Sequence, residues 1–251
     1  MRNYIRTVDV EAFRGEGFEY QMLWVGESCR WLASSLGPGA AGLGLHVHDV
    51  DHFYFVLSGE LHVQLGDEPV VVKPETVVYV PAGTPHRTWN ETDAPELHLE
   101  VLAPGPDPSK VPWTETDSTD APGGAIVRTV DEMDIDPKVT IFDRRLLLQK
   151  SDGAEDILLY EAKLEPGDKG MGLHVHSTVD QFYYVLEGQL SCQIGLQQCT
   201  IGPNTLAVLP RDLPHDMWND SAQVERHLSM VTPGAVPNQP GAHIDVQLTA
   251  G

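Results

Sequence analysis

The sequence predicts an all-β protein built from two consecutive copies of one domain, each a β-barrel or a β-sandwich. The first observation is an internal repeat: Gly44–His48 recurs as Gly172–His176, 128 positions later, and Phe53–Gly59 recurs with small changes as Phe182–Gly188, 129 positions later. The second is that Gly or Pro interrupts short runs of β-forming residues about every ten positions, a spacing typical of barrels and sandwiches. The third is that no segment shows convincing helical periodicity.

The predicted strands follow one another in the same order in each copy. In the first copy, Phe53–Leu57 is an apolar run of aromatic and β-branched residues, which is typical of a buried strand. Leu61–Leu65 alternates apolar and polar residues, so one face of this strand is expected to be buried. Val70–Val72 and Val77–Val80 predict two further strands, with a turn at Lys73–Glu75 between them.

The segment Ala103–Gly124 is rich in Pro, Gly, Ser, Thr and Asp, which is the composition of a linker. We therefore expect an N-terminal domain over residues 1–112 and a C-terminal domain over residues 113–251. Alternating residues over His243–Leu248 make this segment a candidate edge strand, and Tyr4–Phe13 is a second candidate.

Composition and charge exclude several classes of partner. The chain has 251 residues, of which 41% are hydrophobic, so it can bury a core, and its net charge is −21. A surface this acidic repels phosphate backbones and anionic membranes, so neither nucleic acid nor membrane is an expected partner. Met1–Asp9 contains no apolar run, so a secretory signal is not expected. The three cysteines lack metal-site spacing, and together these features predict a cytoplasmic location.

Histidine is the residue type most informative about function, because many of the 11 histidines occupy equivalent places in the two copies. His46 and His48 are separated by one residue, so on a strand both side chains lie on the same face. His52 follows closely, and His86 comes later on a turn rich in Gly and Pro. Convergent imidazoles are typical ligands of a first-row divalent metal. The second copy supplies an equivalent set: His174, His176, Gln181 and His215.

The spacing of these residues resembles the first signature motif of the cupin superfamily. In that motif, His-x-His is followed after three or four residues by a position that is usually Glu, and after six more residues by Gly. The first copy matches with His46, His48, His52 and Gly59. The second copy matches with the corresponding residues His174, His176, Gln181 and Gly188.

The second cupin motif, Pro-x-Gly-x-x-His-x-x-x-Asn, is also present in both copies. The first copy has Pro81, Gly83, His86 and Asn90. The second copy keeps the proline, histidine and asparagine but has Asp212 in place of the glycine. The resemblance extends over nearly the whole chain outside the termini and the linker. It implies a bicupin, that is, two tandem jelly-roll-like β-barrels with a metal site inside a barrel.

The resemblance implies a divalent transition metal, such as Fe, Mn, Ni or Zn, with one or two ions per chain. Neither copy has the usual Glu, so we expect ligand sets without a carboxylate, in which the ion keeps its full positive charge and attracts an anionic substrate. His52 and Gln181 either act as fourth ligands or leave three-histidine sites with open positions. A second barrel that has lost its metal is an alternative.

Two further histidines, His98 and His227, occupy equivalent positions in a late strand of each copy. One interpretation makes them catalytic acid or base groups in the pocket, and the other makes them strand residues inherited through the repeat. Arg30 and Arg87 are among the few cations of the chain, and we interpret them as solvated surface residues, with an anion clamp as the alternative.

The resemblance alone does not determine the reaction, because the cupin fold supports many functions. Three-histidine and four-histidine cupins that resemble this chain include dioxygenases acting on phenolic, enolic or diketone substrates, and this is the predicted class. The alternative is a non-redox enzyme, either an isomerase or a polyketide-type cyclase, in which the metal polarises a carbonyl group. A storage-type bicupin is disfavoured because such proteins usually lack the metal-binding histidines. In each enzymatic case the partner is a small-molecule substrate, and the chain is expected to be a monomer or a homodimer.

Overall fold

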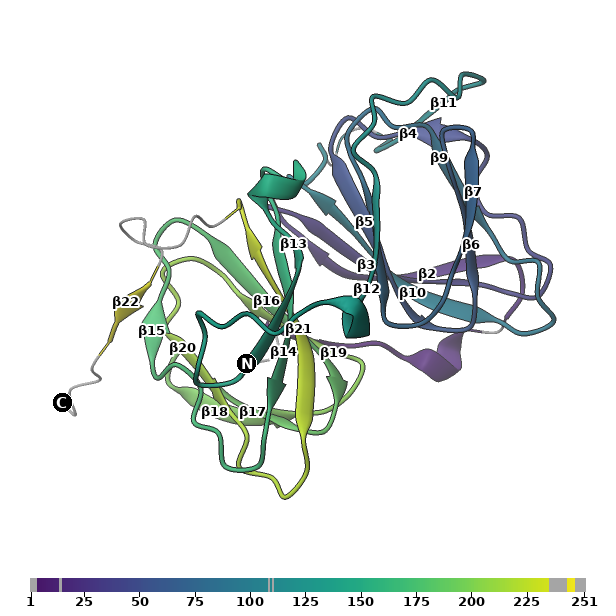
Figure 1. Cartoon of the computed structure of the whole chain (residues 1–251). Coiled ribbons are helices and arrows are strands. Elements are labelled where there is room, and N and C mark those ends of the chain that lie inside the picture. The colour runs from purple at the N-terminus through teal and green to yellow at the C-terminus, as the bar shows by residue number, and fades with distance from the viewer. Residues whose placement is uncertain (1–3, 14, 108, 110, 235–242, 247–251) are drawn as a thin grey trace. The chain divides into compact units, whose positions relative to one another are not determined.

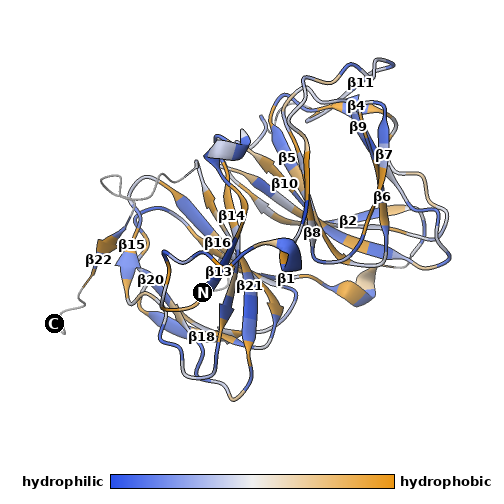
Figure 2. Ribbon diagram, in the orientation of Figure 1, coloured by the Kyte–Doolittle hydropathy of each residue, from blue (hydrophilic) through white to orange (hydrophobic). Residues whose placement is uncertain are grey.

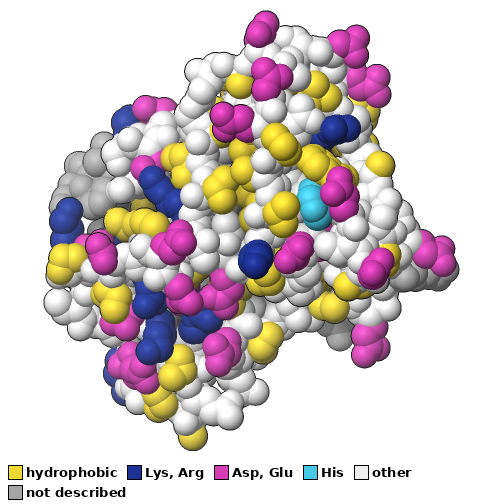
Figure 3. Space-filling model, turned by 45° about the vertical axis from the view of Figure 1, so that its right-hand side comes forward, with side chains coloured by type: hydrophobic (Ala, Val, Ile, Leu, Met, Phe, Trp, Pro, Cys, Tyr) yellow, Lys and Arg dark blue, Asp and Glu magenta, His cyan; other side chains and the backbone are white. Residues whose placement is uncertain are grey.

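The computed structural model describes residues 4–13, 15–107, 109, 111–234 and 243–246, and it confirms the all-β prediction. The helices among these residues are three 3-10 turns: η1 (Val10–Ala12), η2 (Val130–Glu132) and η3 (Lys150–Asp152). None of the described helices is long and apolar enough to cross a membrane. Acidic side chains are distributed over the exposed face in Figure 3, as the net charge of −21 predicts.

The chain forms two compact units. The N-terminal unit comprises the described parts of residues 8–133 and 151–154, and the C-terminal unit comprises those of residues 1–7, 134–150 and 155–251. Residues 113–133 thus group with the N-terminal unit, whereas the composition of the linker placed the boundary near residue 112. The reason is that strands from this stretch pair with strands of the first copy, which composition alone does not reveal.

In the N-terminal unit, a six-stranded sheet and a five-stranded sheet form the walls of a barrel (Figure 1). The six-stranded sheet has the order β12 (Ile126–Thr129), β8 (Thr76–Val80), β5 (Asp51–Ser58), β10 (Glu96–Ala103), β3 (Arg30–Leu36) and β2 (Phe18–Val25). The five-stranded sheet has the order β11 (Thr114–Glu115), β4 (His46–Val47), β9 (His86–Trp89), β6 (Leu61–Leu65) and β7 (Glu68–Val72). All these pairings are antiparallel.

The C-terminal unit repeats this plan. Its six-stranded sheet has the order β1 (Ile5–Thr7), β19 (Thr205–Leu209), β16 (Asp180–Glu187), β21 (Glu225–Thr232), β14 (Leu158–Leu164) and β13 (Asp143–Leu148). Its five-stranded sheet has the order β18 (Gln197–Ile201), β17 (Leu190–Ile194), β20 (His215–Trp218), β15 (His174–Val175) and β22 (Ile244–Asp245).

Each candidate edge segment forms a strand over part of its length, and Val10–Ala12 of the N-terminal segment forms η1 instead. β1 pairs with β19 of the C-terminal unit, with Ile5 opposite Ala207. β22 pairs with β15, with Asp245 opposite His174. Residues 247 and 248 of the predicted alternation lie outside the described residues.

The interior of each barrel is apolar because alternate strand residues face it. In the N-terminal unit, Tyr54 and Val56 of β5 join an inner cluster with Leu36, Leu61 and other aliphatic residues. Phe53, which precedes Tyr54, is buried on the opposite face of the same strand, where its ring meets the ring of Trp31 edge-on. Figure 2 shows hydrophilic and hydrophobic residues alternating along the strands of both units.

The motif glycines that follow β5 and β16 are required by the backbone. Gly59 has a φ of 75° and Gly188 a φ of 74°, a region that residues with a Cβ seldom adopt. A Cβ on Gly59 would also lie 2.7 Å from Cα of Glu96, and one on Gly188 would lie 2.2 Å from the carbonyl oxygen of Val224. These glycines let β5 and β16 turn closely against the start of the strand that carries the buried Glu96 or Glu225.

Candidate metal centres

Three of the predicted ligands in the N-terminal unit converge on one point. His46 opens β4, His86 opens β9, and the two residues face each other in the antiparallel pairing of these strands. His48 follows β4, and one ligand atom from each of the three histidines lies within 4.8 Å of the others. All three side chains are buried. The alternation that predicted a shared face for His46 and His48 therefore holds.

Hydrogen bonds to backbone carbonyls orient these imidazoles. His46 Nδ1 donates to the carbonyl oxygen of Gly44 at 2.7 Å, and His86 Nδ1 donates to that of Thr84 at 2.8 Å. His48 Nδ1 donates to the carbonyl oxygen of Pro112 at 2.6 Å. A neutral imidazole that donates from Nδ1 keeps its lone pair on Nε2. The lone pairs of the three rings therefore point away from these carbonyl groups, where they can bind a cation, and Nε2 of His48 is buried without a hydrogen-bond partner among the described residues.

Burial keeps the three histidines neutral. Together with the nearby His52, it lowers the pKa of His48 to about 3. Burial likewise lowers the pKa of His46 and, more strongly, that of His86. Neutral imidazole is the form that binds a metal, so the set is ready for a cation at neutral pH.

The C-terminal unit holds an equivalent set formed by His174, His176 and His215. His174 Nδ1 donates to the carbonyl oxygen of Gly172 at 2.7 Å, and His215 Nδ1 donates to that of Leu213 at 2.8 Å. Burial lowers the pKa of His174 to about 4 and that of His215 to about 3. The second set thus repeats the convergence of the first, and burial likewise keeps His174 and His215 neutral.

The replacement of the motif glycine by Asp212 leaves the local turn intact. Gly83 has a φ of 78° and Asp212 a φ of 64°, a left-handed conformation that Asp tolerates better than most residues. The N–H of Gly83 donates to the carbonyl oxygen of His48 at 2.8 Å, and the N–H of Asp212 donates to that of His176 at 2.7 Å. Both turns therefore hold the second histidine of the His-x-His pair in the same way.

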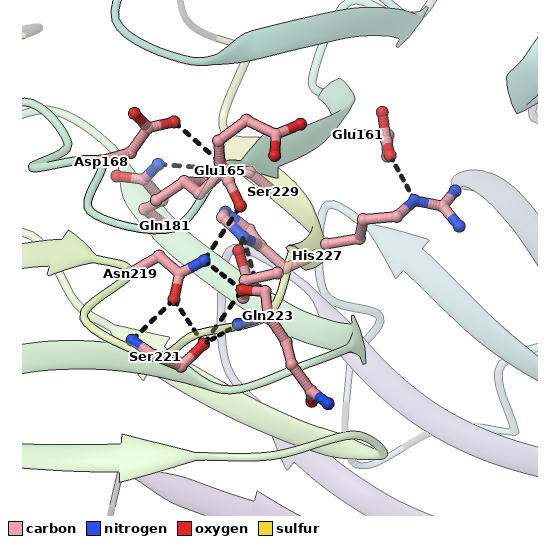
Figure 4. Close-up of polar contacts among 12 residues, drawn as sticks. Glu161, Glu165, Asp168, Gln181, Asn219, Ser221, Gln223, His227 and Ser229 are labelled. Carbon is pink, nitrogen blue, oxygen red and sulfur yellow. Dashed lines mark hydrogen bonds and ion pairs between the residues drawn. The ribbon is translucent and has the colours of Figure 1, made fainter.

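Gln181 faces the histidines of the C-terminal set with its amide oxygen. Gln181 Oε1 lies 2.9 Å from Nε2 of His176 and 3.1 Å from Nε2 of His215. Its amide nitrogen donates to the hydroxyl of Ser229 at 3.0 Å, which fixes this orientation, as Figure 4 shows. Because Nδ1 of His215 donates to a carbonyl, its Nε2 and the amide oxygen both present lone pairs to each other. Two acceptors at this distance fit a cation between them.

The asparagine of the second motif links two segments of each barrel through backbone carbonyl groups. The amide nitrogen of Asn219 donates to the carbonyl oxygens of Leu164 and Gln223, and its Oδ1 accepts from Ser221. Figure 4 shows Asn219 with Ser221 and Gln223. Asn90 makes the corresponding bonds to Leu36 and Ala94 in the N-terminal unit. These asparagines are structural clamps of the repeat.

His52 stands beside the N-terminal set and links it to a carboxylate. Its Nδ1 lies 3.3 Å from Nε2 of His86, and its Nε2 lies 3.4 Å from Oε1 of Glu100. His48, His52 and Glu100 form a second group whose ligand atoms lie within 4.8 Å of one another. A carboxylate therefore lies next to the predicted ligands of the N-terminal unit, although the motif contains none. Glu100 reaches the cluster from β10, a strand outside the motif.

Glu100 is ionised in this position. Burial alone would raise its pKa, but the contact with His52 and the charges of nearby histidines outweigh burial and lower the pKa to about 2. Its Oε2 also accepts a hydrogen bond from the hydroxyl of Ser34 at 3.3 Å. Glu100 belongs to neither sequence motif, although alternation over Glu96–Glu100 places Glu96, His98 and Glu100 on the same face of one strand. In the C-terminal unit the position of Glu100 is taken by Ser229.

His98 and His227 lie deeper in the barrels. His98 Nδ1 contacts both carboxylate oxygens of Glu96, at 3.0 and 2.9 Å, and His227 Nδ1 contacts those of Glu225, at 3.1 and 3.0 Å. Burial opposes a charge on His98, but the Glu96 carboxylate outweighs burial and raises the pKa of His98. The Tyr54 ring contacts both His52 and His98, with centroid distances of 4.3 and 5.4 Å. The structure thus places His98 next to Tyr54 rather than within the converging set.

The segment after each barrel returns to cover its histidines. Pro112 accepts the hydrogen bond from His48, and the ring of Trp113 lies 5.8 Å from that of His46. In the C-terminal unit, the ring of His243 stacks on that of His174 at 4.3 Å. β11 and β22 then pair with β4 and β15 in the same register. The stretch around residue 112, which composition identified as a linker, therefore closes the N-terminal site.

A cavity of about 390 Å³ opens beside the N-terminal set. His48 and Glu100 contribute its polar wall, together with Arg30 of β3. Apolar side chains form most of the rest, including Phe18, Leu32 and Trp113. A small organic molecule could enter this cavity and reach His48.

The donor sets fit a divalent transition metal, because imidazoles suit several such ions. They do not distinguish iron, manganese, nickel and zinc. The buried lone pairs, the neutral rings and the facing acceptors in the C-terminal unit all favour a cation over an empty polar cluster.

Comparisons with known proteins agree with this fold. The family model described as "Cupin domain" matches residues 34–102 and 160–231, which together cover more than half of the chain. No curated protein sequence matches the chain. Several solved structures share the fold at low sequence identity. The oxalate decarboxylase of Lactobacillus farciminis, solved as a formate complex, has a TM-score of 0.71 at 13% identity, covering 97% of this chain and 88% of that one.

Two further structures extend the same likeness. The Bacillus subtilis oxalate decarboxylase, whose Mn(II) centres are the subject of its study, has a TM-score of 0.67 at 14% identity, covering 91% of this chain and 74% of that one. Protein Ylba from E. coli has a TM-score of 0.70 at 14% identity, covering 91% of this chain and 89% of that one. At such identities the likeness concerns the fold.

Proposed function

Because the chain belongs to the cupin family and carries two cupin domains, we propose that it is a metal-dependent enzyme whose N-terminal centre acts on a small organic molecule. The observation that carries this proposal is the convergence of three neutral histidines, His46, His48 and His86, next to a cavity that His48 itself lines. An ion held by these residues is within reach of a ligand in the cavity. The manganese centres of a bacterial oxalate decarboxylase with this fold support a divalent ion.

The reaction we propose is that of a dioxygenase acting on a phenolic, enolic or diketone substrate. A divalent ion bound by neutral imidazoles supplies Lewis acidity and stabilises the anionic form of such a substrate. The apolar walls of the cavity, with Phe18 and Leu32, suit a carbon skeleton larger than oxalate. The substrate named for the decarboxylases of this fold is therefore a poor match for this cavity.

Glu100 would orient the substrate. With a pKa of about 2 it is a carboxylate at neutral pH and accepts a hydrogen bond from a phenol or enol hydroxyl group in the cavity. The same low pKa makes it a weak base, so it accepts a hydrogen bond from the hydroxyl group without taking up its proton.

The presence of this carboxylate also supports the second candidate function. In an isomerase or a cyclase, a proton moves between two positions of the substrate without any change in oxidation state. Glu100 lines the cavity and is better placed than His98, which is not among the cavity's lining residues, to guide such a transfer.

Metal analysis combined with oxygen uptake tests the proposal. We expect the purified protein to contain a divalent transition metal and to consume oxygen with a catechol, pentane-2,4-dione or a flavonol. Chelation should abolish uptake, and so should His86→Ala. His62→Ala is the matched control, because His62 packs on Trp89 outside the cluster. Zinc as the bound metal and conversion of the same compounds without oxygen uptake would favour the non-redox candidate. The absence of both metal and turnover would contradict an enzymatic function.

A further inference from the structure

Arg30 is a cation that the function proposed above does not use. It is the first residue of β3, where it pairs with Leu102 of β10 and Val25 of β2. Its neighbour Trp31 is fully buried on the other face of the strand. Arg30 therefore points to the same side as Leu32, and both residues line the cavity that contains His48 and Glu100.

Among the described residues, Arg30 forms an ion pair with no Asp or Glu side chain. No carboxylate of the described chain lies within ion-pairing distance of its guanidinium group, and Nε is buried without a hydrogen-bond partner. Other arginines do find acids: Arg128 pairs with Asp152, and Arg226 with Glu161. In a chain with 37 acidic and 16 basic residues, a guanidinium group without an acid is unexpected. The buried Nε shows that part of this group is withdrawn from water, so a bound anion that accepts its hydrogen bond would stabilise the arrangement.

The rest of the cavity favours an apolar ligand. Tyr20 and Met22 of β2 line it and expose 59% and 40% of their surfaces. Trp113 and Leu43 line it as well. Exposed apolar side chains that surround a single cation suit a molecule with an apolar body and one anionic group.

The two charges of the cavity define a direction. Arg30 pairs with Leu102 of β10. Glu100 lies two residues before Leu102 on the same strand, so the Cα atoms of Leu102 and Glu100 are about 7 Å apart. Glu100 belongs to the group formed with His48 and His52, so it lies at the histidine end. Its carboxylate repels a second carboxylate at that end, and the guanidinium group of Arg30 attracts one at the other end.

We propose that Arg30 binds the carboxylate of an apolar, ring-sized substrate and thereby directs the opposite end of that substrate to His48 and Glu100. The planar guanidinium group suits a carboxylate because two parallel N–H donors match its two oxygens. This inference rests on the proposed function and deepens it, since it narrows the substrate class to carboxylic acids that carry a second, reactive oxygen.

The subsite is confined to the N-terminal unit. Leu158 of β14 pairs with Val231, and Arg30 of β3 pairs with Leu102. Val231 is the repeat equivalent of Leu102, since the two copies are offset by 129 positions here. The repeat therefore has Leu158 where the first copy has Arg30, and Ser229 where it has Glu100. The C-terminal centre has neither charge, so we expect one carboxylate subsite per chain.

Calorimetric titration of the purified full-length protein with benzoate and with benzamide tests the proposal, because the two probes share a shape and differ in charge. We expect the native protein to bind benzoate at least about tenfold more tightly, since one charge-assisted hydrogen-bond pair contributes roughly that much. Arg30→Met should remove this preference, and Arg30→Lys should retain part of it. Arg87→Met is the control, because Arg87 bonds to Gln64 and stacks on Trp89 away from the cavity.

The outcomes separate this inference from the proposed function. Equal binding of the two probes by the native protein, or an unchanged preference in Arg30→Met, would overturn the subsite. Metal content and oxygen uptake are measured on the same samples. A preference lost only in Arg30→Met establishes the subsite even if no substrate consumes oxygen, in which case the dioxygenase proposal alone fails.

Discussion

Glu100 Oε1 lies 3.4 Å from Nε2 of His52, and this contact brings a carboxylate into a cluster whose sequence motif lacks one. The motif position usually held by Glu is occupied by His52 itself. A strand from elsewhere in the barrel, β10, supplies the acid instead. The charge of the N-terminal centre therefore depends on a residue that no local spacing rule includes.

Replacing Glu100 should lower turnover without removing the metal. Glu100→Gln keeps the size of the side chain but removes its charge, so a substrate hydroxyl group loses its acceptor. We expect kcat to fall by about 10- to 100-fold, because a hydrogen bond to a charged group contributes about 1.5–3 kcal/mol. Glu91→Gln, at a surface position that contacts Trp89, is the control. Steady-state kinetics and metal content are the measurements, and full activity in Glu100→Gln would contradict the proposed role.

Each histidine set should account for its own metal ion. His86→Ala removes a ligand atom from the N-terminal set and should reduce the metal content of that unit. His215→Ala should do the same in the C-terminal unit, because its Nε2 belongs to the second set. The fold should persist in both variants, since the apolar clusters of the barrels do not depend on the ion. Mass spectrometry of bound metal checks this, and unchanged content in His86→Ala would refute the ligand assignment.

The metal-free protein should lose stability in acid. The pKa values of His48, His174 and His215 are lowered to about 3, 4 and 3, from a usual value of 6.5. Between pH 6.5 and about 4, these histidines are neutral when folded but become protonated on unfolding. The unfolded state then binds more protons, so stability falls as the pH falls.

Each such group changes the free energy of unfolding by up to about 1.4 kcal/mol per pH unit in that range. His98 acts in the opposite direction: its pKa is raised, so its contribution is complete below pH 6.5 and is lost as the pH rises through its folded value. Urea denaturation of chelated protein at pH 5, 6 and 7.5 measures the trend, and His215→Ala should reduce the slope. A flat profile between pH 5 and 7 would disagree with neutral buried histidines.

Two glycine variants should separate backbone strain from collision. Gly39 and Gly59 both have positive φ angles, of 67° and 75°. A Cβ on Gly39 meets nothing within 4 Å, whereas one on Gly59 would lie 2.7 Å from Cα of Glu96. Gly39→Ala should therefore cost about 1–2 kcal/mol of stability, the cost of a left-handed conformation. Gly59→Ala should cost clearly more. Equal denaturation midpoints for Gly39→Ala and Gly59→Ala would show that β10 moves away from the new Cβ at position 59 without cost.

The repeat and the histidine pattern made much of the fold and site predictable. Two copies with the same spacing indicated two equivalent domains, and strand alternation placed His46 and His48 on one face. The motif also included His86, although it is 38 positions beyond His48. These features were accessible because they depend on local spacing or on a recognisable turn.

The remaining features depend on contacts between distant segments. Pro112 and Trp113 lie in a stretch whose composition indicated a linker, and composition does not reveal where a loop packs. Arg30 was interpreted as a solvated surface residue, whereas it lines the cavity. Its environment is set by the packing of β2, β3 and β10, which the sequence of β3 does not specify.

The most direct test of the central claim is anomalous diffraction from crystals of the protein loaded with its native metal. We predict an anomalous peak for a metal ion that is coordinated by the Nε2 atoms of His46, His48 and His86. The metal–nitrogen distances should be about 2.0–2.1 Å if the ion is zinc. A peak elsewhere in the N-terminal unit, or none there while these three rings keep their positions, would contradict the account.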